Sequence, residues 1–353
     1  MATIEQGALR AFAQALLQAE GLAEDLAATT AEVLVEGDMI GHDTHGVGLL
    51  PWYLEELAAG QMTTSGAPAV VSDRGACFVW DGRQLPGAVL LARAVDQACD
   101  RAATHGVVTA AIHSAHHTCA LAVFLRRATD RGLIAQISVS NPAAARVAPF
   151  GGTRPLLTPN PLAAGFPTSG DPILVDVSAS ITTTTMTQTL AREGGQFPEP
   201  WVLTAGGKPS TDPREVTERG GTLMPLGGAL KGHKGFGLAL IVDLLGQGLS
   251  GRGRANVAPG PLSQSAFLQV IDPDAFVGAA GFLAQADYLA EAARANPPSD
   301  PAHPVRMPGD AASARRRRAQ KVGVPVADAL LDRLCALARA RGIEMPPAHR
   351  YGA

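Results

Sequence analysis

The spacing of hydrophobic residues changes along this chain, and these changes limit the folds that it can adopt. Apolar side chains recur at helical spacing near the N-terminus and again over residues 232–251 and 326–341. Between these regions, residues 134–140 alternate strictly between apolar and polar side chains, which is the pattern of a strand with one buried face. The sequence therefore predicts an α/β protein in which helices lie toward both ends and strands lie between them.

Shorter patterns predict the remaining elements. We expect helices over residues 26–40, 86–105 and 121–131, and short strands over residues 78–80, 107–113 and 173–177. Thr3 and Gln6 fit a capping box for the first helix. Residues 296–308 are rich in proline and are predicted to form a linker.

Length and charge exclude several classes of protein. A chain of 353 residues with 46% hydrophobic content suggests about two domains. The net charge of −3 gives no electrostatic reason to expect binding to nucleic acid or to a membrane surface. The basic run at residues 315–318 is interpreted as a solvated helix or turn.

The sequence also predicts the cellular compartment of the protein. The four cysteines are scattered without a C-x-x-C pair, which indicates neither a zinc knuckle nor a disulfide framework. No segment approaches the roughly 20 apolar residues of a membrane span, and the N-terminal pattern is unlike that of a signal peptide. We expect a cytoplasmic protein that binds no nucleic acid and no membrane.

One glycine cluster, GQGLSG at residues 246–251, matches the G-x-G-x-x-G pattern of dinucleotide-binding loops. That pattern indicates a nucleotide site only when a strand precedes it and a helix follows it. Here a helical pattern precedes it, so the glycines are better explained as the end of a helix. Any nicotinamide cofactor must therefore bind to a different kind of structure.

Seven of the nine histidines lie in or beside three clusters, HDTHG (42–46), HSAHH (113–117) and HKGFG (233–237). A lone histidine is usually a hydrogen-bonded structural residue, but clusters at the ends of elements lie where functional sites are built. The first two clusters could instead supply three or four imidazoles to a metal ion. These patterns alone leave an acid–base site and a metal site open.

The third cluster has features of an anion site. It is predicted to open a long helix, where free N–H groups and the ammonium of Lys234 suit a phosphate. Its glycines would let a ligand approach the backbone closely. A solvated lysine explains the same pattern, because Lys-Gly pairs are common at helix starts.

Taken in order, the motifs resemble those of the malate/L-lactate dehydrogenase family, which is unrelated to the Rossmann dehydrogenases. Its members include ureidoglycolate, sulfolactate and hydroxycarboxylate dehydrogenases and piperideine-2-carboxylate reductase. The ordered set runs along nearly the whole chain and is more specific than any single motif. The matching segments are GHDTHGVGLLPWY (41–53), HSAHH (113–117), PFGG (149–152), PNPLA (159–163), STDP (210–213), PLGG (225–228), GHKGFGLALIVDLL (232–245) and MPG (307–309).

The resemblance implies a fold and an assembly. It implies a central mixed or antiparallel sheet that binds NAD or NADP, and a helical domain in which both ends of the chain pack together. We place the helical domain at residues 1–75 and 300–353, and the cofactor-binding and catalytic sheet domain at residues 76–299. The resemblance also implies a homodimer.

The resemblance assigns roles to individual residues. His117 matches the family's catalytic proton donor and acceptor, and His45 with Thr44 matches its substrate-contacting pair. No metal ligand is implied. The cofactor contacts that it implies are Lys234, Asp176, Val177, Ser178, Ser140, Asn141, Gly309 and Asp310.

Four positions depart from the family pattern. Ala115 and Cys119 stand where serine and glycine flank the catalytic histidine, and Met186 stands near the family's Gly-Lys. Leu49 replaces an arginine that could bind a substrate carboxylate. Arg146 is our candidate for that role. These departures leave the substrate open.

The predicted reaction is hydride transfer between a nicotinamide and a small 2-oxo acid or cyclic imine, which yields the 2-hydroxy or amino acid. His117 would exchange the proton, which suits imidazole because its pKa lies near working pH. Two alternatives stay open: a family member that has lost redox activity and only binds a ligand, and a metal-dependent hydrolase or lyase.

Overall fold

The computed structural model describes residues 2–349, and segments from the two ends of that range form one small sheet. β1 (Ala2–Ile4) is its central strand and pairs antiparallel with β12 (Val324–Val326) and β13 (Ala348–His349). Thr3 lies within β1, so the predicted capping box is wrong. The N-cap of the first helix is Glu5, whose carboxylate accepts a hydrogen bond from the backbone N–H of Ala8 at 2.7 Å.

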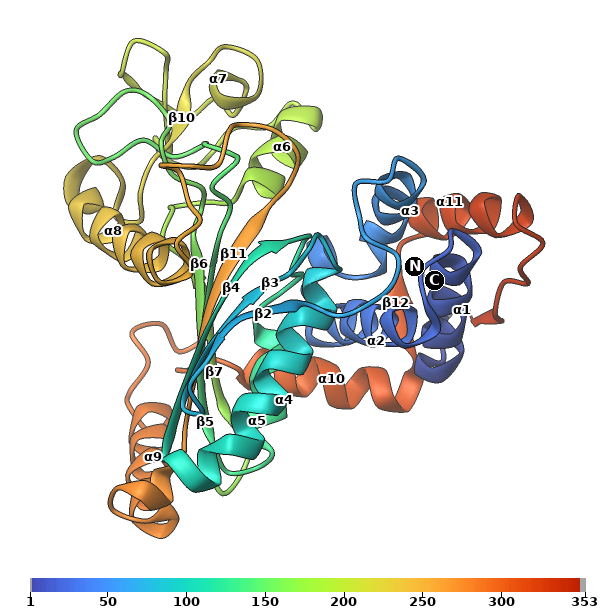
Figure 1. Cartoon of the computed structure of the whole chain (residues 1–353). Coiled ribbons are helices and arrows are strands. Elements are labelled where there is room, and N and C mark those ends of the chain that lie inside the picture. Colours follow the sequence, from blue (N-terminus) through green and yellow to red (C-terminus); the bar gives the residue numbers. More distant parts are fainter. Residues whose placement is uncertain (1, 350–353) are drawn as a thin grey trace.

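Helices from both ends of the chain surround this small sheet. The N-terminal ones are α1 (Gln6–Ala19), α2 (Glu24–Ile40) and α3 (Leu50–Ala58), and the C-terminal ones are α10 (Asp310–Val322) and α11 (Asp328–Arg339). In Figure 1, α10 runs beside α2, and α11 lies beside α3. The expected packing of the two ends of the chain against each other is therefore confirmed.

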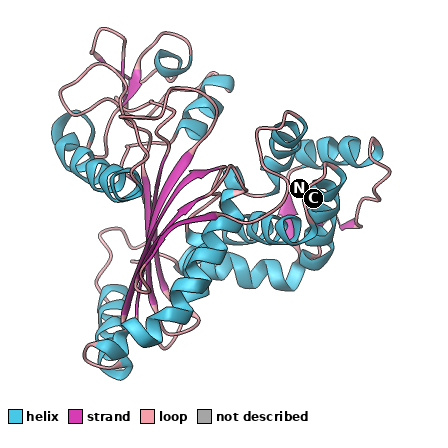
Figure 2. Ribbon diagram, viewed as in Figure 1, coloured by secondary structure: helices cyan, strands magenta, loops and turns pink. Residues whose placement is uncertain are grey.

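The larger sheet has seven strands and lies beside this helical part (Figure 2). The pairing of β3 with β4 is parallel and the other five pairings are antiparallel, which confirms the predicted mixed sheet. In spatial order the strands are β2 (Ala69–Asp73), β3 (Cys77–Asp81), β4 (Val107–Ala115), β11 (Gln264–Ile271), β5 (Ile134–Ser140), β6 (Pro161–Phe166) and β7 (Ile173–Ser178).

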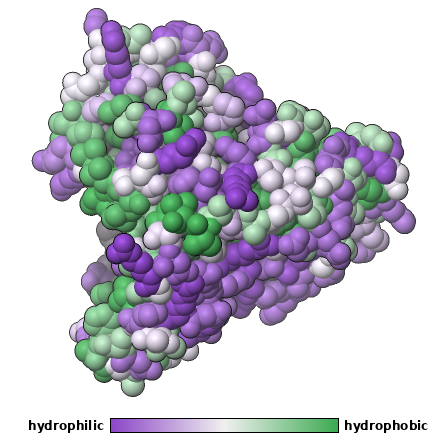
Figure 3. All heavy atoms as spheres, viewed as in Figure 1, coloured by the Kyte–Doolittle hydropathy of each residue, from purple (hydrophilic) through white to green (hydrophobic). Residues whose placement is uncertain are grey.

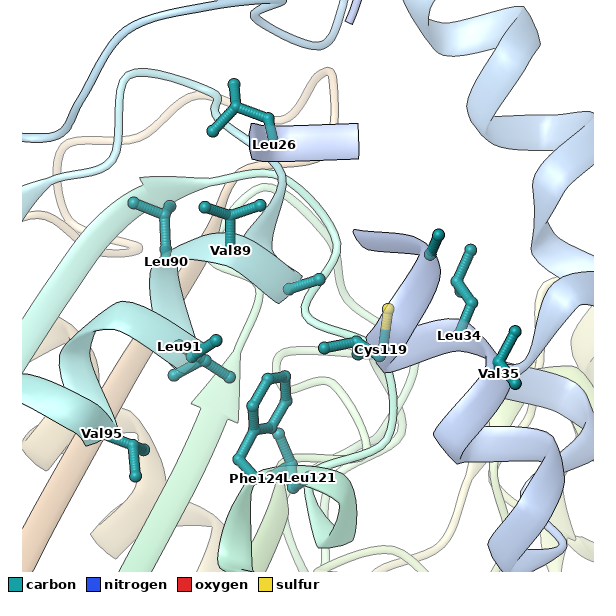
Figure 4. Packing of buried hydrophobic residues seen from close by; sticks show 14 of the residues in the cluster. Leu26, Leu34, Val35, Val89, Leu90, Leu91, Val95, Cys119, Leu121 and Phe124 are labelled. Atoms are coloured by element: carbon teal, nitrogen blue, oxygen red, sulfur yellow. The ribbon is translucent and has the colours of Figure 1, made fainter. Parts of the chain in front are cut away.

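Two helices, α4 (Gly87–His105) and α5 (Ala122–Thr129), cover one face of this sheet. Their apolar residues join those of α2 in the main hydrophobic core, as Figure 4 shows for Leu34, Leu91 and Phe124. The other face of β5 was predicted to be exposed. It is instead largely covered, because Ser140 is 2% exposed and α8 (Gly228–Asp243) lies over β5 and β6.

A smaller unit follows β7 in the chain. Its sheet has the order β10 (Thr222–Leu223), β8 (Val202–Leu203) and β9 (Pro209–Ser210). The helices α6 (Thr184–Arg192) and α7 (Arg214–Thr217) belong to it, and α8 packs against its small hydrophobic cluster through Ala239. Figure 1 shows this unit above the large sheet, with α8 to the left.

The remaining elements confirm one prediction and complete the chain. A π-helix over residues 244–248 continues α8 and contains two glycines of GQGLSG, so this cluster does lie at a helix end. A short 3-10 helix (Pro273–Ala275) precedes α9 (Ala279–Arg294). No helix within residues 2–349 is long and apolar enough to span a membrane.

The HKGFG cluster does not open its helix. α8 begins at Gly228, so Lys234 lies in the second turn, beyond the free N–H groups of the helix start. Gly235 packs against protein and not against a ligand. A Cβ there would lie 2.3 Å from the backbone nitrogen of Leu226 and 2.7 Å from the carbonyl oxygen of Ala179.

This packing predicts opposite effects for two neighbouring glycines. Gly235→Ala forces α8 away from the backbone of Leu226, and we expect it to lower stability by about 2 kcal/mol or more. Gly237→Ala is the matched control, because no atom lies within 4 Å of a Cβ there. It should raise stability by up to about 1 kcal/mol, since alanine favours helix. Thermal melting of both variants measures this, and equal effects would contradict the close packing at Gly235.

Candidate active site

Two imidazoles from distant parts of the chain stack on each other. His45 lies in a 3-10 helix (Asp43–His45) that follows α2, and His117 lies in the loop after β4. Their ring centroids are 5.6 Å apart and the ring planes differ by 17°. The structure thus brings the predicted catalytic residues Thr44, His45 and His117 together.

A hydroxyl holds the Nδ1 atom of each ring. Thr44 Oγ1 lies 2.9 Å from Nδ1 of His45, and Tyr53 Oη lies 2.9 Å from Nδ1 of His117. Within the described part of the chain, neither Nε2 has a hydrogen-bond partner, and neither is a fully buried atom. Both histidines are half-buried. One nitrogen of each ring is therefore fixed, and the other is free to exchange a proton with a substrate.

Tyr53 is the last residue of the motif at residues 41–53, but sequence reasoning assigned it no role in the site. It lies on α3 and is fully buried, and its hydroxyl also contacts the His117 carbonyl at 3.4 Å and Cys119 Sγ at 3.1 Å. A hydroxyl can donate to one neighbour while it accepts from another. Tyr53 can therefore hold His117 in place with the Nδ1 proton present or absent.

Burial keeps both imidazoles neutral. It lowers the pKa of His117 well below the ordinary value, and the nearby His45 and His116 lower it further. Burial also lowers the pKa of His45 to about 4, with a smaller contribution from His42. Since neutral imidazole accepts protons, the site at neutral pH is ready to act as a base.

A second set of contacts fixes the loop that carries His117. Glu56 on α3 makes two contacts. One carboxylate oxygen accepts a hydrogen bond from Trp52 Nε1 at 3.1 Å, and the other lies 3.1 Å from Nε2 of His116. The ring of Trp52 lies edge-on to His117, with centroids 5.4 Å apart. Gly87 at the start of α4 also supports the loop, because a Cβ there would lie 2.4 Å from the His116 carbonyl oxygen.

The segment that carries His45 has its own support. The buried carboxyl of Asp38, at the end of α2, accepts a hydrogen bond from the Val47 backbone N–H at 2.8 Å. Burial raises the pKa of Asp38 to about 7, and the nearby Asp43 adds to the increase. The contact uses the backbone N–H of Val47, so the type of residue at this position does not indicate it in the sequence.

The departures from the family pattern fit this geometry. Cys119 has φ +64°, a left-handed conformation that favours glycine, which explains why glycine is the family residue there. Its thiol points into the core beside Leu34 (Figure 4), and burial raises its pKa to about 12. Ala115 is also buried, whereas Met186 is exposed on α6. Leu49 packs against the core, and Arg146 is exposed.

Several predicted cofactor residues lie along β7, the edge strand of the large sheet. Asp176 and Ser178 belong to β7, and Val177 between them is 43% exposed. Gly309 and Asp310 lie at the other end of β7, where the Leu174 backbone N–H donates to the Pro308 carbonyl at 3.0 Å. The distance along β7 from Leu174 to Ser178 is about 13 Å at the usual rise per residue.

Asp176 also connects this edge with the histidine pair. Its carboxylate accepts a hydrogen bond from the Ala122 backbone N–H at 2.9 Å, directly after the loop that begins at His117. Burial raises the pKa of Asp176, whereas the nearby His42 opposes this change. His42 and His45 belong to one short segment, so β7 and the stacked imidazoles border the same region.

The other predicted cofactor residues lie elsewhere. The Ser140 hydroxyl is 2.5 Å from Asp243 Oδ1 and 3.0 Å from Asn160 Oδ1, inside a buried network, so its polar atom is already used by the fold. Asn141 accepts a hydrogen bond from the backbone N–H of Ala143. Lys234 is exposed on α8, which lies on the opposite side of the upper sheet from α3 in Figure 1.

The residues along β7 suit a dinucleotide. An edge strand has backbone N–H and C=O groups that no neighbouring strand uses, and these can bind the amide and ribose groups of an extended ligand. Gly309, with φ +97°, allows close approach of the backbone. By contrast, no group of three or more histidine, cysteine, aspartate or glutamate side chains within residues 2–349 is arranged to hold a metal ion.

Known proteins resemble this chain over most of its length. Hydroxycarboxylate dehydrogenase B of Escherichia coli O157:H7 is 29% identical over 343 residues, which are 95% of this chain and 93% of that protein. The (2R)-3-sulfolactate dehydrogenase (NADP(+)) of Chromohalobacter salexigens is 34% identical over 241 residues, which are 68% of this chain and 70% of that protein.

A solved structure shows the same fold. The crystal structure of delta1-piperideine-2-carboxylate reductase from Pseudomonas syringae pvar. tomato is similar with a TM-score of 0.86 and 29% identity, and the match covers 96% of this chain and 100% of that chain. The family model for malate/L-lactate dehydrogenase matches residues 4–335. This chain therefore belongs to the malate/L-lactate dehydrogenase family.

Proposed function

We propose that this protein is an NAD(P)-dependent oxidoreductase that interconverts a small 2-oxo acid, or a cyclic imino acid, with its 2-hydroxy or amino acid. The observation that carries this proposal is the stacked pair of His45 and His117, each with a free Nε2, beside the edge strand β7. The names of the relatives, which include hydroxycarboxylate and sulfolactate dehydrogenases, support both the substrate class and a nicotinamide cofactor.

His117 is proposed as the acid–base residue, and His45 with Thr44 as the substrate contacts. In the oxidative direction, Nε2 of neutral His117 takes the hydroxyl proton while the substrate C–H bond breaks. When bound, the nicotinamide accepts that hydrogen as hydride. In the reductive direction, Nε2–H of His117 returns the proton to the new oxygen or nitrogen. A bound substrate carboxylate would favour the imidazolium form, because an opposite charge nearby raises the pKa of an imidazole.

Asp176, Val177, Ser178, Gly309 and Asp310 are proposed to bind the cofactor along β7. Their common location on one exposed edge supports this role. Ser140, Asn141 and Lys234 are proposed as further cofactor contacts. The Ser140 hydroxyl donates to the side-chain carbonyl of Asn160, whose backbone carbonyl accepts a hydrogen bond from the Ala179 N–H at 3.2 Å. Lys234 is exposed on α8, away from β7, and its role rests on the family resemblance.

A homodimer and a cytoplasmic location are part of the proposal, as is the division into domains at 1–75 with 300–353 and at 76–299. The apolar outer surface of α8 and of the π-helix that continues it supports dimer formation, because Leu230 is 86% exposed and Leu244 is 67% exposed. Figure 3 shows hydrophobic surface on the upper left, where α8 lies in Figure 1. Large exposed apolar patches commonly mark protein interfaces.

The first prediction concerns turnover by the protein and the role of His117. Oxidation of NADH or NADPH should be observed with at least one member of a panel of 2-oxo acids and cyclic imines. His117→Ala should then lower kcat by about 10²- to 10⁴-fold, which is the usual contribution of acid–base catalysis, with little change in cofactor affinity. His303→Ala is the control, since its side chain is 82% exposed and pairs with Asp300. Unchanged turnover in His117→Ala would remove this assignment.

The second prediction concerns Tyr53 as a positioning residue. Tyr53→Phe keeps the buried ring but removes the hydroxyl that holds Nδ1 of His117. We expect kcat to fall about 5- to 30-fold, because a buried hydrogen bond contributes about 1–2 kcal/mol, and the pH profile to move. Tyr288→Phe, at a 70% exposed tyrosine, should leave both unchanged. A lower melting temperature without a change in the pH profile would indicate a purely structural role.

The third prediction concerns pH. The kcat/KM of oxidation reports ionisation in the free enzyme, where the neutral form of His117 is active. Because the pKa of His117 is well below its ordinary value and that of His45 is about 4, oxidation should keep its rate from pH 8 down to about pH 6. The kcat/KM of oxidation should begin to fall only below about pH 6. An inflection near pH 6.5 that disappears in His117→Ala would show that burial does not lower this pKa.

A further inference from the structure

The four arginines at residues 315–318 on α10 divide into two pairs. Arg316 Nε donates to Glu36 at 2.5 Å, and Arg317 donates to Asp171 at 2.5 Å. Arg315 and Arg318 lie three residues apart and therefore on one face of the helix. Within residues 2–349 these two guanidinium groups form no hydrogen bond and no ion pair.

Arg315 and Arg318 border a cavity of about 470 Å³. It lies between α10, the end of α2 and the small terminal sheet. Met39 and Val322 contribute apolar wall, so most of a ligand in the cavity would contact carbon atoms. Arg315 lies against the end of α2, since a Cβ on Gly41 would be 2.5 Å from its Nη1 atom. Its head group is thus placed beside the cavity by packing.

The lining of the cavity also includes acidic residues. Asp38 and Asp43 line the cavity, and neither forms an ion pair with Arg315 or Arg318 among the described residues. The carboxyl of Asp38 is occupied by the Val47 backbone N–H, so Asp43 is the carboxylate that is available to a ligand. The cavity therefore offers positive groups on α10, a negative group at residue 43 and apolar residues in the same lining.

We propose that this cavity binds a small zwitterion with an apolar side chain, which is the chemistry of a hydrophobic α-amino acid. Arg315 and Arg318 would bind its carboxylate, Asp43 would bind its ammonium, and Met39 and Val322 would contact its side chain. Guanidinium and carboxylate form strong charge-assisted hydrogen bonds. The sequence pattern of four arginines hides this division, because only the fold shows which two are already paired.

Binding there would affect the segment that holds His45. Asp43 belongs to the same 3-10 helix as His45, and Asp38 anchors the following residues through Val47. A ligand that fixes Asp43 would therefore restrict the motion of this segment. The cavity is a site separate from the stacked imidazoles, since neither His45 nor His117 lines it.

Calorimetric titration of the full chain with three matched probes tests the proposal. The probes are L-leucine, the anion 4-methylpentanoate, which lacks the ammonium, and the cation 3-methylbutylamine, which lacks the carboxylate. We expect leucine to bind with a Kd below about 10 mM and each of the other two at least about tenfold more weakly, because each lacks one charged contact. No leucine binding, or equal binding of 4-methylpentanoate, would overturn the proposal.

Variants locate the binding. Arg318→Gln and Arg315→Gln should each weaken leucine binding about tenfold or more. Arg317→Gln removes the same charge from the opposite face of α10 and should leave the affinity unchanged. Asp43→Asn should weaken leucine binding but not that of 4-methylpentanoate. His117→Ala should retain leucine binding, so that loss in this variant, or equal loss in Arg317→Gln, would place leucine elsewhere and contradict the proposed site.

Discussion

The buried hydroxyl of Tyr53 is the contact on which the active site depends. It lies on α3 in the helical part of the chain, yet it reaches Nδ1 of His117 in the loop that leaves the large sheet. Because it also contacts Cys119, it ties the loop that carries His117 to the main core through one atom. Removal of water from this region lowers the pKa of His117 and strengthens the hydrogen bond that orients it. Burial of this region thus affects both the position and the protonation state of the His117 imidazole.

Much of the fold could be predicted because it rests on local patterns. The alternation at residues 134–140 gave the bounds of β5, and the helical context of GQGLSG correctly excluded a Rossmann-type loop. Predictions that depended on contacts distant in the chain were less successful. On the polar face of β5, Ser138 and Ser140 are buried because α8 lies over them, whereas Gln136 is exposed, and no property of residues 134–140 indicates this difference. Thr3 matched a helix cap but pairs in a sheet with residues more than 300 positions away.

The site was predictable in part for a similar reason. Thr44, His45 and His117 could be identified because they belong to short motifs with a family resemblance, and the structure places them together. Tyr53 belongs to one of these motifs, but its role and that of Glu56 were not predicted, because both arise from packing between α3 and a loop some sixty residues later. Lys234 and Gly235 show the converse problem. Their motif suggested a helix start that binds phosphate, whereas α8 begins earlier and Gly235 is needed for contact with Ala179 and Leu226.

The small terminal sheet affects how the chain folds during translation. β1 is translated more than 300 residues before its neighbours β12 and β13. Until then the apolar faces of α1 and α2 lack the partners that α10 and α11 supply, and exposed apolar surface makes a nascent chain prone to aggregation. His45 follows α2, so its surroundings are also completed late. His45 should therefore reach its final surroundings only after α10 and α11 have been synthesised, whatever the folding rate of the central sheet.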